Sequence, residues 1–166
     1  MDRDDGFEEF YRASRHRVVT VLYALGGDLH EAQDAAQEAY VRAWQRWRRI
    51  SEYDDPEAWV HLVGHRLLQN RWRKIRNGIT AHRRNGPVTA VEPPSENNVA
   101  LVAALRQLPT DQREAIVLHH LADLSVADIA TRTAVPVGTV KARLARGRKA
   151  LAPLLGTTLP EEVSNA

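Results

Sequence analysis

The sequence has 166 residues, and its 23 Lys and Arg side chains nearly balance 21 Asp and Glu. With 43% hydrophobic and 27% charged residues it has a globular composition, and its length fits one domain or two small ones. Because it contains no cysteine, a disulfide framework, a thiolate metal site and a cysteine nucleophile are excluded. No apolar run reaches the ~20 residues of a membrane span and the acidic start is unlike a signal peptide, so we expect a cytoplasmic protein.

Charge is unevenly distributed along the chain. Residues 1–60 carry 8 basic and 13 acidic side chains, whereas 61–90 carry 7 basic and none acidic. Residues 91–135 carry 3 basic and 6 acidic side chains, and 136–166 carry 5 and 2. Two basic blocks separated by acidic ones are typical of a chain that contacts a polyanion at two places, although solvated helix faces give the same pattern.

Three amphipathic helices are predicted in the first half of the chain. Apolar residues recur at three- and four-residue steps over 7–25, and two glycines then end the first helix. Asp28 is expected to cap a second helix that runs to about Arg49, and Asp55, which precedes a proline, to cap a third that runs to about Lys74. The second helix is expected to bury Ala32, Ala35, Ala36, Ala39, Tyr40, Ala43, Trp44 and Trp47, and the third to bury Trp59, Leu62, Val63 and Leu67.

The second half begins with a break in the pattern. Residues 75–97 contain two glycines and three prolines without any apolar period, which predicts a flexible linker. Four short helical patterns follow, at about 98–107, 110–122, 125–133 and 137–154. Since no strand pattern of useful length occurs, we predict an all-α protein of two small helical domains, 1–74 and 98–156, with a polar tail over 157–166.

The last two predicted helices have the spacing of a helix-turn-helix, within LSVADIATRTAVPVGTVKARLARGRKAL over 124–151. The second helix of the pair is expected to bury Val137, Val140, Leu144 and Leu151. Its outer and flanking residues are Thr139, Lys141, Ala142, Arg143, Ala145, Arg146, Arg148 and Lys149. Such a helix fits a DNA major groove, where outer side chains read base edges and flanking cations bind phosphates. Arg146 is the main base-reading candidate, because a guanidinium bonds bidentately to guanine.

These residues resemble a known family. LSVADIA followed by VPVGTVKARLARGRKAL resembles region 4 of extracytoplasmic-function sigma factors of the sigma-70 superfamily, and DAAQEAYVRAW over 34–44 resembles their region 2 helix. The segment 58–74 resembles the helix that follows it. Together the resemblances cover roughly 7–74 and 98–155, in the family's order. They imply a non-enzymatic RNA polymerase sigma factor that directs promoter-specific transcription initiation.

The resemblance also implies roles for particular residues. The Asp-x-x-Gln-Glu helix would dock on the β′ clamp coiled coil of core RNA polymerase through Asp34, Gln37, Glu38 and Arg42. The minus-10 element would be opened and read by Ser51, Tyr53, Arg66, Asn70, Arg71, Arg73 and Lys74, with Trp72 as a further stacking candidate. The helix-turn-helix residues named above would bind the minus-35 element. The expected partners are core RNA polymerase, through its β′ and β subunits, promoter DNA and an anti-sigma factor.

Some residues depart from the family's pattern. Thr133 and Ala134 stand where Leu-Gly is usual before the turn. Since alanine at positive φ costs about 1 kcal/mol more than glycine, the turn is either built differently or slightly strained. In the proposed minus-10 loop, Glu52 and Asp54 fit poorly with a DNA contact.

Two other classes of protein stay open at this point. A two-domain helix-turn-helix regulator that does not bind core polymerase would explain the second half, but it does not require the Asp-x-x-Gln-Glu helix. A metalloenzyme is suggested by His61 and His65, one helical turn apart, and by the adjacent His119 and His120. The first pair lacks the glutamate of HExxH and no carboxylate cluster completes a zinc site, so the sequence predicts neither a metal nor a cofactor.

Overall fold

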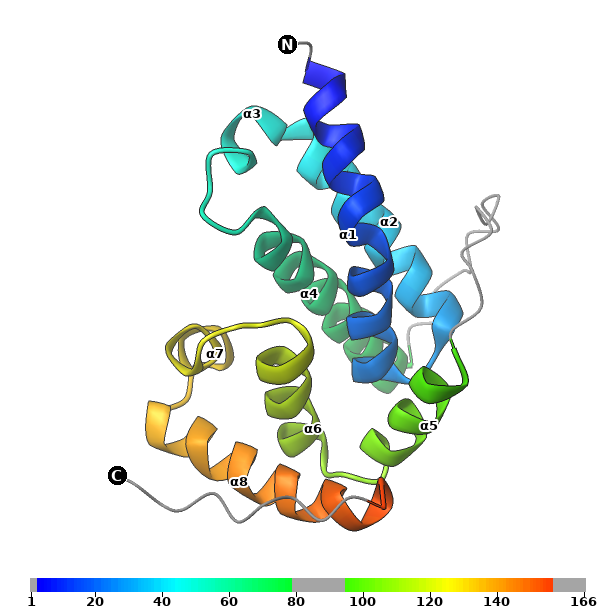
Figure 1. Ribbon diagram of the computed structural model, residues 1–166, viewed down its shortest axis with the longest axis vertical. Coiled ribbons are helices and arrows are strands. Elements are labelled where there is room, and N and C mark those ends of the chain that lie inside the picture. The colour runs from blue at the N-terminus through cyan, green and yellow to red at the C-terminus, as the bar shows by residue number, and fades with distance from the viewer. Residues whose placement is uncertain (1–2, 79–94, 157–166) are drawn as a thin grey trace. The chain divides into compact units, whose positions relative to one another are not determined.

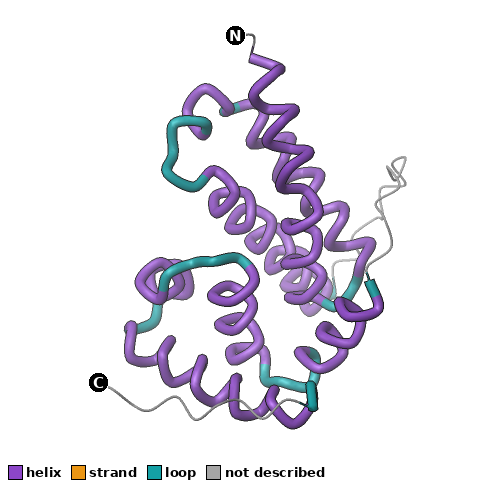
Figure 2. Tube along the Cα trace, viewed as in Figure 1, coloured by secondary structure: helices purple, strands orange, loops and turns teal. Residues whose placement is uncertain are grey.

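The computed structural model describes residues 3–78 and 95–156, and over these residues the chain forms helices and loops without a strand (Figures 1 and 2). This confirms the predicted all-α class. The chain divides into two compact units, one up to Pro94 and one from Ser95 onward. No described helix has the length and apolar character that crossing a bilayer requires.

The N-terminal unit is a bundle of three long helices and one short one. Helices α1 (Arg3–Gly26), α2 (Leu29–Gln45) and α4 (Pro56–Arg76) pack against one another, and the four-residue helix α3 (Trp47–Ile50) contacts α1 and α2 (Figure 1). Small side chains form the inner stripe of α2, where Ala32, Ala35, Ala36, Ala39 and Ala43 are buried. Because alanine adds little bulk, this stripe lets α1 and α4 approach closely.

Two predicted helix caps are confirmed. The Asp28 carboxylate accepts a hydrogen bond from the backbone N–H of Glu31 at 3.0 Å, and the Asp55 carboxylate accepts one from that of Ala58 at 3.0 Å. Each satisfies a backbone donor that the first turn of a helix leaves without a partner. Gly27, at φ 74°, provides the left-handed residue that ends α1.

The second helix ends earlier than predicted. Instead of running to Arg49, α2 stops at Gln45, and Arg46, at φ −115°, separates it from α3. The break turns Trp47 into the core, where its ring stacks on Phe10 at a centroid distance of 4.9 Å. Trp44, predicted to be buried with it, is instead 47% exposed. The apolar period assumed one continuous helix, so it could not anticipate this change of direction.

The buried side of α4 also differs from the prediction. Of Trp59, Leu62, Val63 and Leu67, only Leu67 is buried, and the core side is Val60, His61, Gly64, His65, Leu67 and Leu68. A Cβ atom added to Gly64 would lie 2.8 Å from Cδ1 of Leu22 on α1. The close approach at this glycine turns α4 so that two histidines, which a search for apolar periodicity passes over, face inward.

The C-terminal unit contains α5 (Glu96–Leu105), α6 (Thr110–Ile116), the π-helical turn η1 (Val117–Leu121), α7 (Val126–Thr133) and α8 (Val137–Leu154). Helix α8 packs against α6 and α7 (Figure 1). The predicted cap at Ser125 is confirmed, because its hydroxyl accepts from the backbone N–H of Asp128 at 3.0 Å. The predicted linker is helical at both ends, since α4 reaches Arg76 and α5 starts at Glu96; residues 79–94 and the tail beyond 156 lie outside the described residues.

The turn between α7 and α8 is strained at the expected position. Ala134 adopts φ 56° and ψ 40°, the left-handed conformation that favours glycine. Of the two alternatives considered for this turn, the structure therefore shows the strained one. Asp123 shares this backbone feature at φ 56°, which the sequence did not suggest.

The buried side of α8 is close to the predicted one. Val140 and Leu144 are buried and Leu151 is half-buried, but Val137, predicted to be buried, is 43% exposed because it lies at the first position of the helix. Gly147 completes the inner side. A Cβ atom at this position would lie 2.7 Å from Cγ1 of Ile116, so the absence of a side chain lets α8 press against α6.

We expect Gly147→Ala to lower the free energy of unfolding of this unit by about 1 to 3 kcal/mol, because the added methyl overpacks the contact with Ile116. Gly138→Ala on the same helix is the matched control. A Cβ atom there meets nothing within 4 Å, so the better helix propensity of alanine should raise stability by up to about 1 kcal/mol. Chemical denaturation measures both variants, and effects of the same sign and size would contradict the packing described for α8.

Candidate nucleic-acid and polymerase interfaces

The outer side of α8 presents a basic surface. The eight residues predicted for DNA contact all lie on this helix, and none of them is buried. Lys141, Ala145, Arg146 and Lys149 are exposed, while Thr139, Ala142, Arg143 and Arg148 are partly exposed along the flanks. With no acidic residue between 137 and 154, this side of the helix has the charge that phosphate contact requires.

The arginines of α8 fall into two kinds. Arg143 lies 3.6 Å from the Asp111 carboxylate on α6, and Arg148 donates from Nε to Nε2 of His120 on η1 at 3.0 Å. Both side chains are therefore oriented by neighbours before any ligand binds. Arg146, in contrast, forms no ion pair or hydrogen bond with a described residue. Its guanidinium is available for bidentate contact with a base.

The residues predicted on α4 do not all point the same way. Arg66, Arg73 and Lys74 are exposed, and Arg73 donates a hydrogen bond to the side chain of Asn70. Arg71 is turned toward α2 instead, where its guanidinium lies 3.8 Å from the Asp34 carboxylate. A partly exposed ion pair of this length contributes about 1 kcal/mol or less, so a ligand of either residue can replace it.

The polar side of α2 lies opposite its buried alanines. Gln37, Glu38 and Arg42 are exposed, with Arg42 donating to the Glu38 carboxylate at 2.7 Å. Asp34 is partly exposed at the same side of the helix. The contact between Asp34 and Arg71 therefore connects α2, whose polar side is predicted to bind polymerase, with α4, which is predicted to bind DNA.

The loop between α3 and α4 carries the other predicted DNA residues. Ser51 is exposed and Tyr53 is 38% exposed. Trp72, the further stacking candidate, packs against the end of α1 instead, since a Cβ atom at Gly26 would lie 3.0 Å from its ring. Trp72 is thus half-buried, and Tyr53 is the more exposed of the two aromatic side chains.

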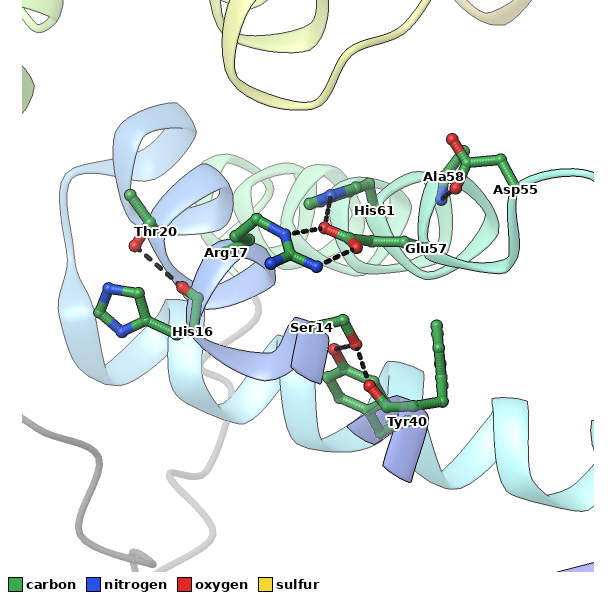
Figure 3. Close-up of polar contacts among 10 residues, drawn as sticks. Ser14, His16, Arg17, Thr20, Tyr40, Asp55, Glu57, Ala58 and His61 are labelled. Carbon is green, nitrogen blue, oxygen red and sulfur yellow. Dashed lines mark hydrogen bonds and ion pairs between the residues drawn. The ribbon is translucent and has the colours of Figure 1, made fainter. Parts of the chain in front are cut away.

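A polar network that joins α1 to the first turn of α4 was not predicted from the sequence. Arg17 of α1 makes two hydrogen bonds to Glu57 in the first turn of α4, at 2.9 and 2.7 Å (Figure 3). His61, 1% exposed, holds the same carboxylate through Nε2 at 3.3 Å. Partial burial alone would raise the pKa of Glu57, but the hydrogen bonds and charges of Arg17 and His61 lower it to about 2. The contact joins residues 40 positions apart, so no local pattern reveals it.

The histidines in the described part of the chain do not assemble a metal centre. His61 and His65 lie in the core, and Nε2 of His61 is engaged by Glu57. His119 bonds through Nδ1 to the backbone oxygen of Leu124 at 2.9 Å, and His120 accepts from Arg148. Across 3–78 and 95–156, no three potential metal ligands of the His, Cys, Asp or Glu type come together.

The Glu57 network predicts a pH dependence of stability. The folded carboxyl has a pKa of about 2 against an ordinary 4.5, so its contribution is complete above pH 4.5 and is lost as the pH falls toward 2. We expect Glu57→Gln to destabilise the N-terminal unit at pH 7 and to match the wild type near pH 2. Urea denaturation across this range measures the difference, with Glu9→Gln on the exposed side of α1 as the control. If the difference in free energy of unfolding between Glu57→Gln and the wild type did not change with pH, the role of the network in stability would be contradicted.

Comparison with known proteins assigns both units. The model of sigma-70 region 2 matches residues 10–78, and that of sigma-70 region 4 matches residues 98–151. The chain is 29% identical to the ECF RNA polymerase sigma factor SigW of Bacillus subtilis, with 89% of this chain and 87% of SigW covered. It is 31% identical to SigM of Mycobacterium tuberculosis, with 90% and 77% covered. The fold resembles the sigma factor RpoE of Bartonella quintana, solved with the anti-sigma factor NepR, at a TM-score of 0.73 and 22% identity over 93% and 99% of the two chains.

The two units and their order define a sigma-70 type protein, with region 2 in α1–α4 and region 4 in α5–α8. Within this superfamily, the chain belongs to the ECF RNA polymerase sigma factors. It is a transcription initiation factor that directs RNA polymerase to promoters. A helix-turn-helix regulator that does not bind polymerase would not carry region 2, and this alternative is set aside.

Proposed function

We propose that the chain is a cytoplasmic, non-catalytic specificity subunit in which each unit holds one promoter element. Region 2 binds core RNA polymerase and the minus-10 element, and region 4 binds the minus-35 duplex. Polymerase performs the phosphoryl transfer, and the sigma chain contributes binding and position. The observation that carries this proposal is the arrangement of arginines on the outer side of α8. Arg146 has no partner among the described residues, whereas Arg143 and Arg148 on the flanks are held by neighbouring side chains.

In region 4, the two kinds of arginine suit different tasks. Arg148 uses one N–H on His120, which leaves four N–H groups of its guanidinium for a phosphate. A side chain held in advance loses less conformational freedom on binding, so Arg143 and Arg148 suit sequence-independent contacts with the backbone. Arg146 suits base reading, and Ala142 and Ala145 offer only methyl groups, which fit a thymine methyl.

In region 2, the polar side of α2 supports docking to polymerase. Asp34, Gln37, Glu38 and Arg42 offer carboxylate, amide and guanidinium groups along an exposed helix side, and we assign them to the β′ clamp coiled coil. A polymerase cation that engages Asp34 would displace Arg71 from its 3.8 Å contact. Arg71 then joins Arg66, Asn70, Arg73 and Lys74 of α4 as a contact for the opened strand, together with Ser51 and Tyr53 of the loop.

Regulation by an anti-sigma factor is part of the proposal. The solved structures with this fold include RpoE with the anti-sigma factor NepR and CnrH with the cytosolic domain of CnrY; CnrH matches at a TM-score of 0.59 and 20% identity over 90% of this chain. We infer that this chain is also held by a partner of that kind, which would compete for the surfaces that contact polymerase.

Transcription with purified components tests the function. Core RNA polymerase reconstituted with this protein should start RNA at discrete sites on genomic fragments, and sequencing the 5′ ends should reveal shared minus-35 and minus-10 elements. Core polymerase alone is the control. Tight promoter binding by the protein together with no transcription above this control would indicate a regulator and contradict the proposal.

The α8 assignments predict two different mutant behaviours. Arg146→Ala should cost about 1 to 3 kcal/mol on the cognate minus-35 duplex and relax preference at one base pair, because a bidentate base contact is lost. Arg148→Ala should weaken binding to all sequences and flatten the salt dependence, because a phosphate contact is lost. Binding of holoenzyme to cognate and scrambled minus-35 duplexes separates the two. Equal losses on both DNAs for both variants would contradict the assignments.

A further inference from the structure

The corner between α2 and α3 carries a concentration of positive charge inside an acidic segment. Residues 1–60 have five more acidic than basic side chains, yet 42–50 contain four arginines and no acidic residue. Arg42 is paired with Glu38 on α2. The other three, Arg46, Arg48 and Arg49, are exposed and form no ion pair with a described residue. We call these three residues the α3 basic surface.

The α3 basic surface is held on a fixed support. Trp47 and Ile50 are 9% and 1% exposed. The Trp47 ring stacks on Phe10 at 4.9 Å and meets Phe7 edge-on at 5.4 Å between ring centroids. These contacts anchor a helix of only four residues, too short to be stable by its own hydrogen bonds. Since its two apolar residues face the core, its arginines are presented to solvent.

Exposed aromatic side chains flank the α3 basic surface in the chain. Trp44 precedes it and is 47% exposed, and Tyr53 follows it and is 38% exposed. A segment that combines exposed guanidinium groups with accessible aromatic rings has the groups that bind nucleic-acid phosphates and stack on bases. An acidic protein segment would be attracted by the charge, but it would not use the rings in this way.

The surface also resolves a difficulty in the minus-10 loop. Figure 1 shows that α3 leads directly into the loop before α4. In this loop Glu52 and Asp54 are exposed, so the loop by itself repels phosphates. Asp55 caps α4, and the Glu57 charge is balanced by Arg17. Three exposed arginines immediately before the loop offset its remaining negative charge.

We propose that Arg46, Arg48 and Arg49 bind phosphates of promoter DNA next to the opened minus-10 element. The proposal rests on the proposed function and adds a contact surface to it. The ligand is the DNA backbone, so the surface contributes affinity and salt dependence, while the choice of sequence stays with the loop, α4 and α8.

The test uses the full chain bound to core polymerase on a promoter, and it compares Arg48→Gln/Arg49→Gln with Arg12→Gln/Arg15→Gln, an equal charge change on α1. Raising the salt concentration from about 50 to 200 mM weakens DNA binding by both proteins. If each arginine neutralises one phosphate, this loss of affinity should be about 7- to 12-fold smaller for the Arg48→Gln/Arg49→Gln variant than for the wild type. The α1 variant should keep the wild-type salt dependence. Arg46→Gln, measured separately, should reduce the slope by about half as much as the double variant.

The inference would be overturned if the slope of log DNA affinity against log salt concentration were the same in the wild type, in Arg48→Gln/Arg49→Gln and in Arg46→Gln. Weaker binding to core polymerase with an unchanged slope on DNA would also overturn it, because the surface would then face a protein. Thermal unfolding followed by circular dichroism verifies that the variants are folded. Failure of the wild-type holoenzyme to open the promoter would contradict the proposed function itself, and this result is distinct from a difference between variants.

Discussion

A glycine at a close helix–helix contact fixes the rotation of each helix that we assign to DNA. Gly64 places α4 against Leu22 of α1, and Gly147 places α8 against Ile116 of α6, with no room for a Cβ atom at either contact. Once a helix is pressed against its neighbour at a glycine, its opposite side must face outward. On α8 that outward side carries Arg146, and on α4 it carries Arg66 and Arg73. The positions of the DNA-facing side chains therefore follow from core packing.

Charge pairing then distinguishes outward side chains that neighbours orient from those that have no such neighbour. Arg71, Arg143 and Arg148 each have a neighbour that orients them, whereas Arg146 and the α3 basic surface have no such partner among the described residues. The contact between Arg71 and Asp34 joins α2, which we assign to polymerase, to α4, which we assign to DNA, within region 2. If polymerase engages Asp34, as we propose, Arg71 is released toward DNA, and the coupling is limited by the small strength of this ion pair.

Sequence patterns predicted the helices and their caps well, because these depend on neighbouring residues. Asp28, Asp55 and Ser125 cap the helices that they were expected to cap. The rotation of α4 and the exposure of Trp44 were predicted wrongly, since the first depends on Leu22 fitting against Gly64 and the second on the break at Arg46. Apolar periodicity also treats histidine as polar, so it missed His61 and His65 in the core.

For the candidate sites, the sequence predicted which residues lie on the outer side of α2 and α8. It could not predict the hydrogen bonds and ion pairs that orient side chains at these sites. The bonds from Arg17 to Glu57 and from Arg148 to His120 join residues 40 and 28 positions apart, and such contacts exist only after folding. The π-helical turn that carries His119 and His120 has no local pattern that distinguishes it from α-helix. The family resemblance implies the roles, which stay predictions, and the structure shows which neighbours hold the residues concerned.

The central claim is that the outward sides of three helices have different ligands in one open complex: α2 contacts polymerase, α4 the minus-10 element and α8 the minus-35 duplex. Photo-cross-linking from single sites in the open complex tests it most directly, with a photoreactive residue placed in turn at Glu38, Arg73 and Arg146. The account predicts that position 38 links to the β′ subunit, position 73 to DNA at the minus-10 element and position 146 to the minus-35 duplex. Links from position 146 to polymerase instead of DNA, or from position 38 to DNA alone, would contradict it.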